Sequence, residues 1–269
     1  MVDQLGKEII TVPMYLRLWD SQGFPDRTLR NWLLFSETTD WQTVHNRLCG
    51  FAYSLLVVTL RELKIISEKQ DIPELPRHDE ESARKLCKEK PEDYVPLVIE
   101  LQKRLASAFR EHMTAGQSYY TSNSNREIFY HKFVENSGQV DHENMPEHGQ
   151  YGCESWNLVE AGERLCRFID EHKVLESHQG PRRPLVILAL DEAHVLTDNL
   201  PEQRRDLFMV LRQYLRQLQM LPIFWLFIST AACFDKWPPR NLPDPSARVR
   251  EPDNRPLDLI SEISFDDIA

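Results

Sequence analysis

Residues 185–192 read LVILALDE, and this segment decides how the rest of the sequence is interpreted. Its first six residues are apolar and do not alternate with polar residues, which is typical of a strand buried on both faces in a parallel sheet. A helical pattern at 207–218 and a second apolar segment, IFWLFI at 223–228, follow it. A strand, a helix and a strand in this order form a βαβ unit, which predicts that the two strands are parallel neighbours.

The residues before this unit predict one short strand and a group of helices. Residues 9–12 are a β-branched run that we expect to end at Pro13. Apolar residues at three- and four-residue steps predict helices, which lie at 40–68, 94–109, 127–135 and 158–175. The polar, glycine-containing segment 137–152 is the best linker candidate.

These patterns divide the chain into four parts. Residues 1–36 hold the first strand, 37–152 form a helical insertion and a linker, 153–236 form the βαβ core, and 237–269 are rich in proline. The expected fold class is therefore α/β, with three layers, a short parallel sheet and a large helical insertion before the βαβ core.

Composition and charge exclude several classes of protein. The formal net charge is 32 − 42 = −10, which disfavours binding to nucleic acid or to acidic membranes. The longest apolar segments, 51–60 and 221–234, are too short to span a bilayer, and the N-terminus lacks a signal sequence. Five scattered cysteines without a C-x-x-C pair favour free thiols in a reducing compartment, so we expect a cytoplasmic protein.

Two adjacent carboxylates, Asp191 and Glu192, follow the buried strand directly. The carboxyl ends of parallel strands are where α/β sheets bind their ligands. In a nucleoside triphosphatase the first carboxylate at this place holds Mg²⁺ and the second orients the attacking water. Ser229 and Thr230 follow the next strand, where a hydroxyl can contact the terminal phosphate. The alternative is that the carboxylates only stabilise the start of a following helix.

The chain has no glycine-rich loop that could cradle phosphates. Neither G-x-G-x-x-G nor G-x-x-x-x-G-K-[ST] occurs in the sequence, which contains only nine glycines. Asp191 and Glu192 by themselves would make a weak Mg²⁺ site, because no lysine and no ring of backbone N–H groups would hold the phosphates.

Three segments carry a resemblance to known proteins: LVILALDEAHVLTD at 185–198, LFMVLRQYLRQL at 207–218 and IFWLFISTAACFDKWPP at 223–239. Upstream, VPMYLR at 12–17, GFP at 23–25 and RNWLL at 30–34 add to it. Together they resemble a large group of uncharacterised fungal P-loop NTPase-like proteins. The resemblance implies an additional-strand P-loop fold, with the helical insertion between the second and third strands of the parent fold.

The resemblance also implies roles for the polar strand ends. Asp191 would hold Mg²⁺, Glu192 would act on the water, and Ser229 or Thr230 would sense the phosphate of ATP or GTP. In that group a phosphate loop precedes residues similar to MVDQL, with which this sequence starts. We therefore expect a core fragment, from a shortened gene, a misplaced start or a degenerate paralogue. Residues 1–36 would be the remnant of the helix and strand after the loop, and the chain would bind Mg²⁺ and ATP poorly and lack turnover.

Other interpretations stay open. The chain could be a non-catalytic module that binds a protein partner through its helices at 40–115. The letters DEAH at 191–194 and STA at 229–231 are also similar to two motifs of DEAH-type helicases. His194 is interpreted as a surface residue, and Arg212 and Arg216 as solvated or ion-paired. A zinc set is disfavoured because the spacing matches no finger pattern; its members would be Cys153, Cys166, His172 and His178.

Overall fold

The computed structural model describes residues 2–17, 26–34, 41–70, 72, 85, 91–117, 124–139, 157–170, 183–196 and 207–229. All of them belong to one compact unit, Met1–Thr230. The elements follow in the order α1 (Val2–Leu5), β1 (Ile10–Tyr15), α2 (Arg27–Leu33), α3 (Trp41–Lys69), α5 (Pro91–Thr114), α6 (Ser124–Gln139), α7 (Leu158–Ile169), β2 (Val186–Asp191), η2 (Ala193–Leu196), α9 (Leu207–Leu215), η3 (Arg216–Leu218) and β3 (Ile223–Ile228). The predicted proline-rich segment lies outside the described residues.

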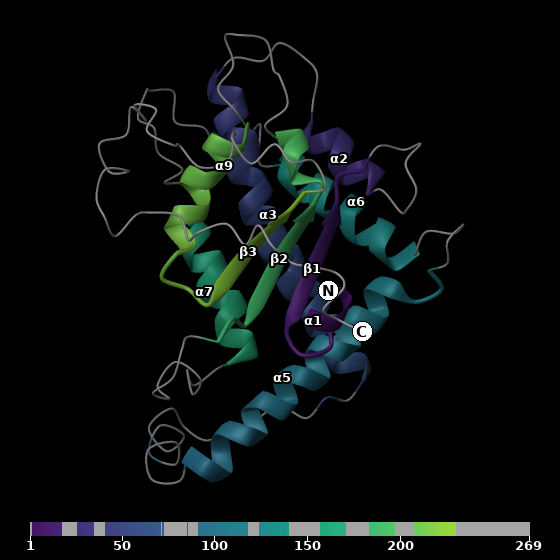
Figure 1. Cartoon of the computed structure of the whole chain (residues 1–269), viewed down its shortest axis with the longest axis vertical. Coiled ribbons are helices and arrows are strands. Elements are labelled where there is room, and N and C mark those ends of the chain that lie inside the picture. The colour runs from purple at the N-terminus through teal and green to yellow at the C-terminus, as the bar shows by residue number, and fades with distance from the viewer. Residues whose placement is uncertain are drawn as a thin grey trace, which may run out of the picture. The chain divides into compact units, whose positions relative to one another are not determined.

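The three strands of the described residues form one parallel sheet with the order β1-β2-β3. β2 lies in the middle, and all six of its residues are buried. Val186 pairs with Ile10 on one side and Ile223 on the other, and Asp191 pairs with Tyr15 and Ile228. The prediction of a buried strand at 185–190 with a parallel neighbour at 223–228 is therefore confirmed. The chain is a mixed α/β protein, mostly helical, with a short parallel sheet (Figure 1).

β1 does not end at Pro13, as the sequence predicts, but continues to Tyr15. Leu16 donates its N–H to Asp191 O on β2, whereas the carbonyl groups of Pro13 and Tyr15 accept hydrogen bonds from residues on the other side. The peptide groups of residues 13 and 15 thus point away from β2. The missing N–H of Pro13 costs no bond in the sheet, which is why proline is tolerated at this position of an edge strand.

α3 is the longest helix of the described residues, and it runs behind the sheet in Figure 1. It contacts α5, α6, α7 and α9. Phe51 on α3 packs against Trp225 on β3 and, edge to face, against Phe133 on α6, with ring centroids 6.3 and 5.5 Å apart. The helices predicted at 40–68 and 94–109 are confirmed as α3 and α5.

Two helices differ in length from the prediction. α6 continues to Gln139, into the segment expected to be a linker, and it buries Phe129, Tyr130 and Phe133. Packing against α3 outweighs the low helix propensity of Ser137 and Gly138. α7 is capped by Asn157, whose side chain accepts a hydrogen bond from Glu160 N at 2.8 Å, and it ends at Ile169 rather than near residue 175.

The cysteines are not all free thiols. Cys49 on α3 is disulfide-bonded, so the prediction of free thiols is wrong for this residue. Cys166 on α7 is a buried thiol that forms no disulfide bond. Sequence spacing does not reveal such a bridge, because it depends on two side chains meeting within a few ångströms in space. None of the helices in the described part of the chain is both long and apolar enough to cross a membrane.

Candidate functional site

The predicted site residues meet at the carboxyl edge of the sheet. Asp191 is the last residue of β2 and pairs in register with Ile228, the last residue of β3. Ser229 follows Ile228 directly, so parallel pairing brings Asp191, Glu192 and Ser229 to the same edge. Thr230, the second predicted sensor residue, lies outside the described residues.

His194 joins the two strand ends. Its Nδ1 lies 3.1 Å from Glu192 Oε2 and 3.2 Å from Ser229 Oγ. Only 21% of its side chain is exposed, so its interpretation as a surface residue has to be revised. A Ser-His-acid catalytic triad requires the serine and the carboxylate to contact opposite ring nitrogens. Both contacts here use Nδ1, so this arrangement is not such a triad.

Glu192 adopts a left-handed backbone conformation, with φ of 58°, between β2 and η2. This conformation is unfavourable for any residue with a Cβ atom. The chain leaves β2 in a turn at this residue. The Glu192 carboxylate contacts His194. An unfavourable conformation held at a strand end is typical of functional sites.

We expect Glu192→Gly to be more stable than Glu192→Ala by about 0.5–1 kcal/mol, because glycine has no left-handed penalty and this outweighs its greater freedom when unfolded. Both variants remove the contact with His194, so the difference between their unfolding free energies reports the cost of the left-handed backbone alone. Urea unfolding followed by circular dichroism measures it. Equal stability of the two variants would contradict a strained Glu192.

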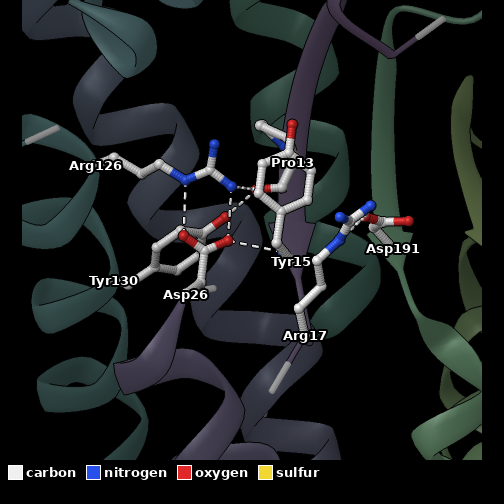
Figure 2. A network of polar contacts seen from close by, with 7 residues as sticks. All are labelled: Pro13, Tyr15, Arg17, Asp26, Arg126, Tyr130 and Asp191. Atoms are coloured by element: carbon white, nitrogen blue, oxygen red, sulfur yellow. Dashed lines mark hydrogen bonds and ion pairs between the residues drawn. The ribbon is translucent and has the colours of Figure 1, made fainter. Parts of the chain in front are cut away.

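Arg17 is a site residue that the sequence pattern did not predict. It lies two residues beyond β1, and its Nε and Nη2 contact Asp191 Oδ2 at 3.0 and 2.9 Å. Figure 2 shows the guanidinium reaching from the end of β1 to the end of β2. Asp191 is only 9% exposed, so the cation compensates a nearly buried carboxylate. The only sequence signal was the position of Arg17 just after a strand in a parallel sheet.

A second ion pair, in which both side chains are buried, lies on the outer side of β1. Arg126 on α6 donates from Nε to Asp26 Oδ1 at 2.7 Å and from Nη2 to Asp26 Oδ2 at 2.6 Å. Asp26 Oδ2 also accepts from Tyr15 N at 2.7 Å. Arg126 Nη2 and the Tyr130 hydroxyl both donate to Pro13 O (Figure 2). The network therefore satisfies the peptide groups that β1 presents away from β2, and it closes this edge of the sheet.

Burial and mutual attraction oppose each other in this ion pair. Burial lowers the pKa of Arg126, but the attraction and hydrogen bond of Asp26, together with Tyr130 and Tyr15, outweigh it, so the pKa of Arg126 is raised. Burial also raises the pKa of Asp26, although the Arg126 guanidinium opposes this shift. The Arg126 guanidinium also lies 4.2 Å from the centroid of the Tyr15 ring. Burial raises the pKa of Tyr130 well above the ordinary value of a phenol, so its hydroxyl remains a donor to Pro13.

Residues 13–17 thus connect the two ion pairs. On one side they bond to Asp26, Arg126 and Tyr130, and on the other Leu16 and Arg17 bond to Asp191. Main-chain hydrogen bonds of Tyr15 and Leu16, on opposite sides of the chain, hold the backbone that leads to Arg17.

The capacity of this edge to hold a metal is limited. Among the described residues, no group of three or more His, Cys, Asp or Glu side chains could hold a metal ion. A divalent cation on Asp191 would take its other ligands from water, from a hydroxyl such as Ser229 and from a bound anion. Of the disfavoured zinc set, Cys166 is a buried thiol and the other members lie outside the described residues.

Fold and site together define a mixed α/β protein whose parallel strands end in a cluster of carboxylate, imidazole, hydroxyl and guanidinium groups. No family model, curated protein or solved structure matches the chain.

Proposed function

We propose that this chain supplies part of a nucleoside triphosphatase site and derives from an additional-strand P-loop fold. The observation that carries the proposal is the meeting of Asp191, Glu192 and Ser229 at the carboxyl ends of two parallel strands. In this proposal Asp191 holds Mg²⁺ through water, Glu192 orients the attacking water, and Ser229, with Thr230, contacts the terminal phosphate.

The environment of each residue supports its role. Asp191 ends the buried middle strand, so its carboxylate is held rigidly. His194 Nδ1 lies 3.2 Å from Ser229 Oγ and 3.1 Å from Glu192 Oε2, so the phosphate-sensing and water-orienting positions are neighbours. In the same proposal, α3, α5 and α6 between β1 and β2 correspond to the helical insertion of the parent fold.

The sequence lacks the phosphate loop that supplies most of the binding energy for a triphosphate in such proteins. We therefore propose that this chain binds MgATP weakly, with a dissociation constant of about 1 mM, rather than turning it over. ATP and GTP are both candidate ligands, because no described residue selects a base.

The test is MgATP binding to the full chain by isothermal titration calorimetry. Asp191→Ala and Asp191→Asn are expected to weaken binding about 10-fold or more, because both remove the anionic Mg²⁺ ligand. Asp3→Ala is the matched control, since it removes a carboxylate that is also paired with an arginine but lies elsewhere. The proposal would be contradicted if no binding were detected at a MgATP concentration 10 times the expected dissociation constant, or if all variants bound MgATP equally. Either result would favour an interaction module that acts through the helices at 40–115.

A second candidate function is that of a DEAH-type helicase fragment. The hydrogen bond between His194 and Ser229 favours it, because it joins the two segments that resemble helicase motifs. The net charge of −10 disfavours it. A single-stranded RNA oligonucleotide that strengthens MgATP binding would support this candidate, and no effect of the RNA would contradict it.

A further inference from the structure

We propose that Arg17 is an internal counter-ion that competes with a divalent cation for Asp191. This inference rests on the proposed function, because the cation site is the same, and it adds how that site is regulated. The sequence predicts Mg²⁺ as the only cation on Asp191. The structure places a guanidinium on the same carboxylate, with two nitrogens on one oxygen.

Asp191 needs a cation at all times. It is 9% exposed, and an ionised carboxylate with so little solvent contact is stable only when it is paired and hydrogen-bonded. Arg17 meets this need through Oδ2, while Figure 2 shows the second carboxylate oxygen turned away from Arg17. Glu192 has a different partner, because its carboxylate contacts His194.

The two members of the pair differ in their freedom to move. Asp191 is fixed at the end of β2, and its carbonyl accepts the N–H of Leu16. The main chain before Arg17 is fixed as well, because Tyr15 bonds to Asp26 through both its N–H and its carbonyl. The Arg17 side chain, however, is 34% exposed and long, so it can move into solvent while its backbone stays in place.

This difference gives the site an order of events. A divalent cation alone must displace or repel Arg17, which lowers its affinity for Asp191. A triphosphate that arrives with the cation offers Arg17 new anionic oxygens, and guanidinium groups bind phosphates through charge-assisted hydrogen bonds. Arg17 therefore makes the site discriminate against a bare cation and favour a cation bound to phosphate.

The test is Mn²⁺ binding to the full chain without nucleotide, measured by electron paramagnetic resonance of the free ion. We expect Arg17→Met to bind Mn²⁺ about 10-fold more tightly than the unmodified chain, because a competing cation has been removed. Arg110→Met is the matched control, since Arg110 also contacts an aspartate, Asp3, with two nitrogens, and we expect no change. The double variant Arg17→Met/Asp191→Asn is expected to lose the gain.

Circular dichroism establishes that each variant is folded. If Arg17→Met does not fold, Arg17→Gln keeps a donor for Oδ2 without the charge and carries the same expectation. A folded variant that lacks the Arg17 charge and binds Mn²⁺ no more tightly than the unmodified chain would overturn the inference. Tighter Mn²⁺ binding together with no MgATP binding would overturn the proposed function and leave this inference standing, so the two failures are distinguishable.

Discussion

Replacing Arg126 with methionine is expected to destabilise the folded chain by about 3–5 kcal/mol, because it leaves the Asp26 carboxylate buried without its cation. The side chains of Arg126 and Asp26 are 5% and 6% exposed. The substitution also removes the donor from Arg126 Nη2 to Pro13 O, one of the bonds that close the outer edge of β1. Urea unfolding followed by circular dichroism measures the free energy of unfolding.

The control for this experiment is Arg110→Met. The ion pair of Arg110 with Asp3 has a similar geometry but lies at the surface, so its loss is expected to cost at most about 1 kcal/mol. The double variant Asp26→Asn/Arg126→Met should lose less unfolding free energy than the summed losses of its two single variants, because it leaves neither charge unpaired. If Arg126→Met loses no more stability than Arg110→Met, the buried pair does not hold β1.

The second large effect is expected at the centre of the sheet. Leu188→Ala should destabilise the chain by about 2–5 kcal/mol, because Leu188 is fully buried and the substitution leaves a cavity. Leu188 pairs with Val12 on β1 and with Trp225 on β3, so the cavity would lie in the middle strand between both neighbours. Because β2 also positions Asp191, the same variant tests whether the sheet supports the proposed site.

Leu97→Ala provides the matched control, since the same side chain is 42% exposed on α5. Its expected effect is within about 0.5 kcal/mol. Both unfolding free energies come from the same denaturant experiment. A Leu188→Ala variant as stable as Leu97→Ala would show that the middle strand is less tightly packed than the structure indicates.

The sequence predicted the sheet and the main helices because their signals are local and periodic. An uninterrupted apolar run identified β2, and apolar residues at helical spacing identified α3 and α5. The errors arose where packing outweighed local preference. β1 continues through Pro13 because the proline faces away from its neighbour, and α6 continues through Ser137 because it packs against α3.

The same division holds for the candidate site. The sequence by itself determined that Asp191, Glu192 and Ser229 lie at one edge, because two strands joined by a helix are parallel and parallel strands end on the same side. Only the tertiary structure decided their partners. Arg17 meets Asp191 across 174 positions of sequence, and Arg126 meets Asp26 across 100. Such pairs leave no periodic signal in a sequence, because a single charged residue is placed by the packing of whole helices and strands.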